Sequence, residues 1–325
     1  MDNLVVSYSE LKAWRFCRQS HYFKYIDRIT PRRKPRPLKV GSILHKLLEY
    51  HTAGKDWTPI IKEVKSEYDK MFDEEKDFYG NLPEEAQRIM EGYQKIYKGE
   101  KAKYLMIEKE IGPIPLTPKV SFKMRLDRLV YHSDTKLTLL CETKSGKKIP
   151  QEDIRIWDLQ TILYVWALRQ TGQKVDGILW DYIRTKPPSI PPLLKSGALS
   201  QRQDMDTTQE VYLQAIKENK LQPADYQEFL DSLKGRESQF YRRVILPVNE
   251  SIVEPILSDA RMSAREIYYL REHPVKTISG YTCPRCMFSS LCYAELRGLD
   301  TDFIREHEFM NKEEEVEYGE DENSD

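Results

Sequence analysis

Hydrophobic residues in the first hundred positions of this chain recur at helical spacing. An opening helix is expected after Ser7 or Ser9, either of which can cap it. A second helix is expected to begin at Gly41, and its core-facing stripe consists of Ile43, Leu44, Leu47 and Leu48. Two or three further helices are expected within residues 57–100. The N-terminal third is therefore predicted to be helical.

The hydrophobic period changes to two at Tyr104, which indicates strands. Strands are predicted at 104–111, 119–131 and 136–143, with a Pro-rich turn after the first of them. The apolar run that opens the third strand is typical of a central strand. Later elements are predicted as a long helix at 153–170, a strand at 176–183, a strand near 240–246 and an amphipathic helix near 250–272.

This order of elements predicts an α/β fold with a central mixed sheet flanked by helices. We divide the chain into five regions. They are an N-terminal helical region at 1–103, a core sheet with its helix at 104–186, an insertion at 187–240 opened by four prolines, a C-terminal helix with a cysteine cluster at 241–297, and an acidic tail at 298–325.

Composition changes this picture little, with 40% hydrophobic and 32% charged residues as in other globular chains. No apolar run approaches the roughly 20 residues needed to cross a bilayer. The N-terminus lacks the basic-then-apolar layout of a secretory signal. We therefore expect a cytoplasmic protein with no membrane partner.

The formal net charge of −1 conceals a strong polarity along the 325 residues. Residues 312–325 hold eight acids and one lysine, which leaves +6 on the rest of the chain, and we expect this tail to be disordered. Between Lys12 and Lys39, ten Lys/Arg residues stand against one acid. Such a block can bind polyphosphate, or it can be a solvated helix face with a basic loop. Aromatic residues that could stack on bases there are Trp14, Phe16, Tyr22, Phe23 and Tyr25.

Four of the five cysteines suggest a metal site. Cys17 stands alone near the N-terminus, whereas Cys283, Cys286 and Cys292 cluster near the C-terminus. Four thiolates can hold either Zn²⁺ or an Fe–S cluster. Cys141 lies in an apolar run and is predicted to be a buried core thiol.

Candidate chemistry gathers at the end of the predicted central strand. Residues i and i+2 of a strand face the same side, so Glu142 and Lys144 emerge together, and Asp127 comes from the neighbouring strand across a hairpin. Two carboxylates and an ammonium suit phosphodiester hydrolysis assisted by Mg²⁺ or Mn²⁺. Taken alone, such a triplet is also common as a surface ion pair.

The order of these residues resembles RecB-like nucleases of the PD-(D/E)XK superfamily. The matching features are Gly41 with His45, Asp127 in Arg125-Leu126-Asp127-Arg128, Glu142-Thr143-Lys144, and Gln160 with Tyr164. Ser7 to Cys17 and the three C-terminal cysteines look like the iron–sulfur branch of that family, which includes the CRISPR-associated RecB-like exonucleases and the nuclease domain of AddB. The insertion resembles those of phage-encoded relatives. Cys17 is followed by Arg18 where the family often has proline.

The resemblance implies a role for each matching residue. His45, Asp127, Glu142 and the Thr143 carbonyl would ligate the catalytic metal, and Lys144 would be the catalytic lysine. Gln160 and Tyr164, one helical turn apart, would orient the lysine or the DNA. The resemblance also favours a structural [4Fe–4S] cluster over Zn²⁺ at Cys17, Cys283, Cys286 and Cys292.

The function expected from these features is a metal-dependent exonuclease on single-stranded DNA ends, in recombination, repair or phage DNA metabolism. One alternative is a DNA-binding or assembly module with little or no turnover. Another is the nuclease subunit of a helicase–nuclease complex. The chain has no Gly-x4-Gly-Lys-Ser/Thr motif, so a helicase or recombination partner would be a separate chain.

Overall fold

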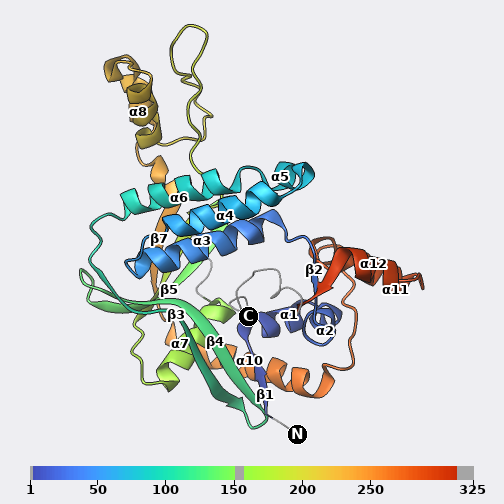
Figure 1. Ribbon diagram of the computed structural model, residues 1–325. Coiled ribbons are helices and arrows are strands. Elements are labelled where there is room, and N and C mark those ends of the chain that lie inside the picture. Colours follow the sequence, from blue (N-terminus) through green and yellow to red (C-terminus); the bar gives the residue numbers. More distant parts are fainter. Residues whose placement is uncertain (1–2, 151–156, 313–325) are drawn as a thin grey trace.

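A mixed six-stranded sheet runs through the centre of the computed structural model, which describes residues 3–150 and 157–312 (Figure 1). The path β1-β4-β5-β6-β7 comprises Leu4–Val6, Val120–His132, Leu137–Gly146, Gly177–Arg184 and Tyr241–Pro247, and β3 (Ala102–Thr117) pairs with the other edge of β4. The β1–β4 and β5–β6 pairs are parallel, and the other pairs are antiparallel. The predicted α/β fold with a mixed sheet is confirmed.

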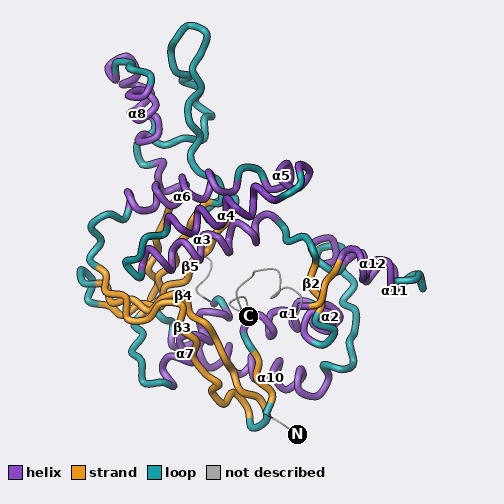
Figure 2. Tube along the Cα trace, in the orientation of Figure 1, coloured by secondary structure: helices purple, strands orange, loops and turns teal. Residues whose placement is uncertain are grey.

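Helices cover both faces of this sheet (Figure 2). On one side lie α3 (Arg36–Thr52), α4 (Thr58–Lys70), α5 (Asp73–Tyr79) and α6 (Leu82–Ile96), of which α3, α4 and α6 share a core with β6 and β7. On the other side α1 (Tyr8–Phe16), α7 (Leu159–Gln170) and α10 (Glu250–Leu270) pack on β3, β4 and β6. The largest fully buried side chain, Trp180, lies in this second core.

The segment between β6 and β7 forms an arm that projects beyond α6 (Figure 1). It contains α8 (Gln209–Glu218), η2 (Pro223–Tyr226), α9 (Gln227–Ser232) and η3 (Arg236–Gln239). These elements surround a small apolar core of their own that includes Tyr212 and Phe229. The arm therefore packs largely on itself rather than on the sheet.

The C-terminal end of the described chain meets the segment that follows α2 (Arg18–Tyr25). There β2 (Ile29–Pro31) pairs antiparallel with β8 (Phe309–Asn311), next to η4 (Cys283–Arg285), α11 (Ser289–Leu296) and α12 (Asp302–Glu308). Neither short strand was expected from the sequence, because three residues carry too little pattern to reveal a strand.

Three predicted boundaries need correction. The second helix begins at Arg36 rather than at Gly41, because Pro37 fits the first turn of a helix. Pro113 and Pro115, expected in a Pro-rich turn with Pro118, lie in β3, which continues to Thr117, and only Pro118 lies in the turn. The helix expected from 153 begins at Leu159 after its cap, Asp158, and the start of that prediction lies outside the described residues. Ser7 does cap the opening helix.

The expected disordered tail at 298–325 also needs correction, because α12 and β8 lie within it, while its part beyond residue 312 lies outside the described residues. Among the helices of the described chain, none is long and apolar enough to span a bilayer.

Candidate active site

The candidate site lies in the fork where β4 diverges from β5. The ladder between these strands runs from His132–Leu137 to Arg128–Cys141 and ends there. One residue further on, the Asp127 side chain replaces the missing backbone partner, since its Oδ2 accepts a hydrogen bond from the Thr143 amide at 2.7 Å. The end of the ladder thus fixes this carboxylate beside the Glu142–Lys144 segment.

The next two site residues share one face of β5, as the alternation of the strand requires. Lys144 Nζ donates to Glu142 Oε1 at 2.7 Å and to Gln160 Oε1 at 2.7 Å. The ammonium also lies 5.8 Å from the centre of the Trp180 ring, which is within the range of a cation–π contact. The lysine is therefore held in one position by three neighbours.

Helix α7 supplies Gln160 because its first turn points at β5. Asp158 Oδ1 accepts a hydrogen bond from the Thr161 amide at 3.1 Å, so the helix is capped two residues before Gln160. Tyr164 lies one turn later, is buried, and is hydrogen-bonded to Gln160. Burial, and then the negative charge of Glu142, raise the pKa of Tyr164. The tyrosine therefore stays protonated and able to donate.

Helix α3 brings His45 to the opposite side of Asp127. A Cβ at Gly41 would stand 3.2 Å from Ser145 Oγ, so the glycine lets this helix approach β5 closely. One turn later, His45 Nδ1 lies 3.6 Å from Asp127 Oδ1. The structure therefore brings His45, Asp127, Glu142, Lys144 and Gln160 into one region, although they span more than a hundred positions of sequence.

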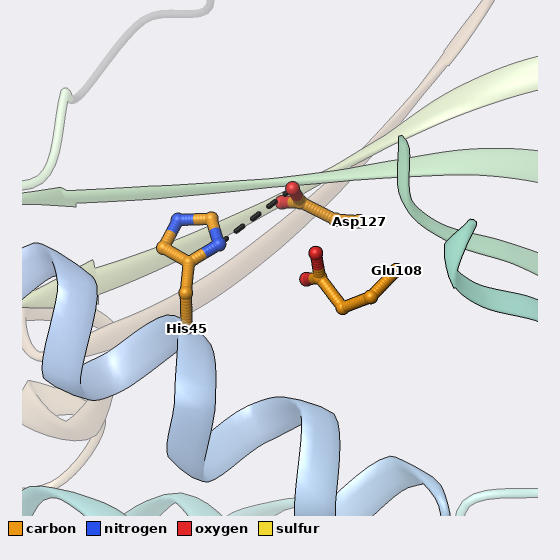
Figure 3. Close-up of side chains that lie close together, drawn as sticks. All are labelled: His45, Glu108 and Asp127. Carbon is orange, nitrogen blue, oxygen red and sulfur yellow. Dashed lines mark ion pairs between the residues drawn. The ribbon is translucent and has the colours of Figure 1, made fainter. Parts of the chain in front are cut away.

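A residue that the sequence did not reveal also belongs to this region. Glu108 lies on β3 opposite Asp127, and ligand atoms of His45, Glu108 and Asp127 all lie within 4.8 Å of one another (Figure 3). Its backbone has a φ of 44°, which a non-glycine residue seldom adopts within a strand. Glu108 belongs to no motif, so only the pairing of β3 with β4 could have identified it.

The carboxylates of the site are short of positive charge. Glu142 is 2% exposed, and its Oε2 has no hydrogen-bond partner in the described part of the structure. Burial and the neighbouring Asp127 raise the pKa of Glu142 to about 8. The same two causes raise the pKa of Glu108 to about 7, against the effect of Arg125. A cation placed among these oxygens would satisfy the orphaned acceptor and relieve the repulsion. The donor set thus fits a divalent metal.

A second charged cluster lies behind Thr143, on the other face of β5. Arg128, which is 2% exposed, donates to Thr143 Oγ1 at 2.5 Å and to Asp181 Oδ2 at 3.0 Å. Arg243 and Tyr93 also bond to Asp181. Burial alone would raise the pKa of Asp181, but the two guanidinium groups outweigh it and hold that pKa below its ordinary value. We refer to these five residues as the sealed network.

The predicted cysteine ligands come together in part. The Thr277 amide donates to Cys17 Sγ at 3.4 Å, and the Ser279 amide donates to Cys283 Sγ at 3.4 Å, so the N-terminal cysteine lies beside the C-terminal segment. Cys286 and Cys292 pack against the core formed by Phe23, Phe288, Leu291 and Phe309. Within residues 3–150 and 157–312, no three cysteine sulfurs lie within 4.8 Å of one another.

Two of the aromatic residues expected to stack on bases are buried. Trp14 is 3% exposed and donates to Glu266, and Phe23 is 1% exposed in the core with Phe288. Their predicted role in stacking is therefore wrong, because the helical period placed them on the inner faces of α1 and α2. Part of the basic block is also structural, since Arg18 pairs with Glu266.

The fold and the site together define an α/β protein with two carboxylates and a lysine at the end of a central strand. The sequence profile of the PD-(D/E)XK nuclease superfamily matches residues 5–293, and the chain belongs to that superfamily. Among solved structures, a "putative exonuclease" from Eubacterium rectale is similar, with 13% identity over 86% of each chain and a TM-score of 0.44. No curated protein sequence matches the chain.

Proposed function

We propose that this protein is a Mg²⁺- or Mn²⁺-dependent exonuclease that hydrolyses phosphodiester bonds at single-stranded DNA ends, in recombination, repair or phage DNA metabolism. The observation that carries the proposal is the buried, unpartnered Oε2 of Glu142 beside Asp127 and Lys144. An acidic pocket that lacks a counter-charge, next to an ordered lysine, suits a metal and a phosphate together.

The residues that would hold the metal are His45, Asp127, Glu142 and the backbone carbonyl of Thr143. When bound, the metal would neutralise the phosphate and lower the pKa of a water molecule. The side chains around the metal site position the lysine and stabilise charge on the phosphate. Glu142 keeps the Lys144 ammonium in place, and that ammonium stabilises negative charge as it develops on the phosphate.

Gln160 and Tyr164 are proposed to be positioning residues for the lysine. Gln160 Oε1 accepts from Lys144 Nζ at 2.7 Å, and Tyr164 is hydrogen-bonded to Gln160 in turn. Because a lysine has a long and flexible stem, fixing its ammonium before the substrate arrives lowers the entropic cost of the reaction.

The single-strand preference is supported by an exposed aromatic residue near the site. Trp157 is 65% exposed and immediately precedes Asp158, the cap of the helix that carries Gln160. Stacking of a base on an aromatic ring contributes about 1–3 kcal/mol. Arg32 and Arg33, exposed before α3, donate to backbone carbonyls and so keep their charges available to phosphate.

We propose that Cys17, Cys283, Cys286 and Cys292 hold a structural [4Fe–4S] cluster rather than zinc. Zinc at about 2.3 Å from each sulfur would draw the sulfurs to about 3.8 Å apart. No three described cysteine sulfurs lie within 4.8 Å of one another, so the choice of cluster rests on the family resemblance, supported by the approach of Cys17 to the segment that holds Cys283. Absorbance near 400 nm with bound iron is expected, and a colourless protein with bound zinc would contradict the cluster.

Cleavage of end-labelled DNA tests the nuclease proposal. Single- and double-stranded substrates are incubated with Mg²⁺ or Mn²⁺ and wild type, Glu142→Gln, Lys144→Ala or the control Lys98→Ala, which replaces an exposed lysine in the turn after α6. We expect both site variants to lose about a thousandfold in kcat, while the control keeps wild-type rates. Unchanged cleavage in both site variants would refute the mechanism, and inactive wild type would favour a DNA-binding module.

Replacement of Trp157 tests the substrate preference. Trp157→Ala is expected to raise KM for single-stranded DNA about tenfold with little change in kcat, because stacking contributes to binding rather than to the chemical step. Equal KM values for the variant and wild type would show that this ring does not contact the substrate.

A further inference from the structure

We propose that residues 313–325, the acidic segment, dock on the three exposed arginines that flank β2 and compete there with DNA. These arginines, which we call the basic surface, are Arg28, Arg32 and Arg33. The proposal goes beyond the proposed nuclease function and rests on it only for the identity of the competitor.

Pairing of β2 with β8 brings the start of the acidic segment to the basic surface. The two strands are antiparallel, with Ile29 opposite Asn311. One step further, the Lys312 amide donates to the Arg28 carbonyl at 2.9 Å. Residue 313 therefore begins beside Arg28, and Arg32 lies at the other end of a strand of only three residues.

Two arginines of the basic surface keep a charge that their described neighbours do not neutralise. Arg32 and Arg33 each donate to a backbone carbonyl, and in the described part of the chain neither of them pairs with a carboxylate. Arg33 also lies 3.8 Å from the centre of the Phe78 ring, which orders the guanidinium without cancelling its charge. Further along the same basic run, Arg36 and Lys39 pair with glutamates of α6 and α4.

The acidic segment has the charge and the length to occupy this surface. It contains eight acidic residues and no basic residue. An extended chain spans at most about 3.3–3.6 Å per residue, so the segment can reach about 45 Å, several times the length of β2. Its covalent connection through Lys312 also gives it an effective concentration on the order of millimolar at Arg28. A separate polyanion would have to exceed that concentration to take its place.

Carboxylates near Arg32 narrow the place of contact. Asp302 and Glu306 line a shallow groove together with Arg32 and Arg305. The two positive and two negative charges of this groove nearly cancel, so it attracts an acidic chain only weakly. Neither Arg28 nor Arg33 lines the groove, and we place the strongest contacts at these two residues.

The acidic segment and DNA require the same guanidinium groups. A guanidinium that pairs with a carboxylate is not available to a phosphate at the same moment, and the proposed function assigns Arg32 and Arg33 to phosphate. Docking of the segment therefore lowers the affinity for DNA. Because the contacts are exposed, salt should screen them and reduce this effect.

Binding of a labelled peptide tests the docking without DNA or divalent metal. The neutralised variant of the full chain carries Glu313→Gln, Glu314→Gln, Glu315→Gln and Glu317→Gln, and the matched control carries aspartate at the same four positions. Fluorescence anisotropy in EDTA at low salt follows a peptide of residues 313–325. The peptide should bind the neutralised variant about tenfold more tightly than the aspartate control, in which the chain's own segment occupies the surface. Adding Arg32→Ala and Arg33→Ala to the neutralised variant should weaken peptide binding about tenfold, whereas adding Arg202→Ala in the arm should not.

Affinity for single-stranded DNA tests the competition. With a labelled oligonucleotide in EDTA at low salt, the neutralised variant is expected to bind about tenfold more tightly than wild type, and the aspartate control should bind as wild type does. At about 0.5 M salt the difference should fall below about twofold.

Equal peptide binding by the neutralised variant and the aspartate control, or no loss of binding on replacement of the two arginines, overturns the docking. Peptide binding combined with equal DNA affinity of wild type and neutralised variant overturns the competition. The DNA cleavage assay separates this inference from the proposed function. Peptide binding to the basic surface without cleavage by wild type refutes the nuclease and supports the docking, whereas cleavage without peptide binding leaves the nuclease intact and refutes the docking.

Discussion

Two charged clusters lie on opposite faces of β5, and their charge balance differs. In the sealed network, Arg128 and Arg243 surround Asp181, and the pKa of that carboxyl is held low. In the candidate site, Lys144 pairs with Glu142 and Arg125 pairs with Glu108, Asp127 adds a further negative charge, and the pKa values of Glu108 and Glu142 are raised.

The difference separates a structural charge cluster from a binding site. A buried ion pair with all its acceptors satisfied has little affinity for anything else, whereas a buried carboxylate with an orphaned oxygen needs a counter-charge from outside. The alternation of β5 produces both arrangements within three residues, since Thr143 faces the sealed network while Glu142 and Lys144 face the site. The sealed network thereby anchors the back of the segment that carries the chemistry.

The largest effect is expected from breaking the sealed network. Arg128→Met should lower the free energy of unfolding by about 3–5 kcal/mol, because it leaves the Asp181 charge buried without one of its partners. Urea denaturation measures this change. The control Lys123→Met lies on the same strand and should change stability by about 1 kcal/mol or less. Equal losses of unfolding free energy in the two variants would show that the sealed network contributes no more to stability than an ordinary position of β4.

The stability of the metal-free protein is expected to fall as pH rises, because of the two raised pKa values in the candidate site. The pKa values of Glu108 and Glu142 are raised from 4.5 to about 7 and about 8, so the folded protein binds protons more tightly than the unfolded chain does. Metal-free protein should therefore be most stable near pH 5 and lose several kcal/mol by pH 8.

Thermal and urea unfolding in EDTA across this pH range measure the dependence. Glu142→Gln should flatten the curve, because an amide does not ionise, while Glu110→Gln should leave it unchanged. A stability that rises with pH in wild type would contradict the raised pKa values.

Divalent metal should reverse that loss. At a fixed concentration that is a hundred times its Kd at pH 8, Mn²⁺ is expected to stabilise the fold by about 2.7 kcal/mol at pH 8 and by less at pH 6, since protons compete for the same oxygens and raise the Kd. Melting temperatures with and without Mn²⁺ at the two pH values provide the measurement. Asp181→Asn should lower both melting temperatures equally, because that carboxyl lies in the sealed network.

The smallest effect is expected for an ion pair in the arm. Arg202 and Asp204 pair at 2.7 Å, but both side chains are about 70% exposed, and water screens their attraction. Arg202→Ala should leave the free energy of unfolding nearly unchanged in urea denaturation. A loss comparable to that of Arg128→Met would show that proximity of charges, rather than burial, sets the energy of these pairs.

The sequence by itself determined the elements that carry the site. The alternation around Asp127 and the apolar run before Glu142 predicted neighbouring strands with the right residues at their ends, and the structure places Lys144 against both Glu142 and Gln160. These features are local, because the period of a strand or helix fixes which side chains share a face. The superfamily follows from the same residues and from the sequence match over 5–293.

Only the tertiary structure decided which residues outside the motifs join them. Glu108 reaches Asp127 through the register of β3 on β4, and Arg128 becomes part of a sealed network only when β6 and β7 cover it. Burial, likewise, excluded Trp14 and Phe23 from contact with bases. Register and burial depend on contacts between distant segments, so a one-dimensional pattern carries little information about either.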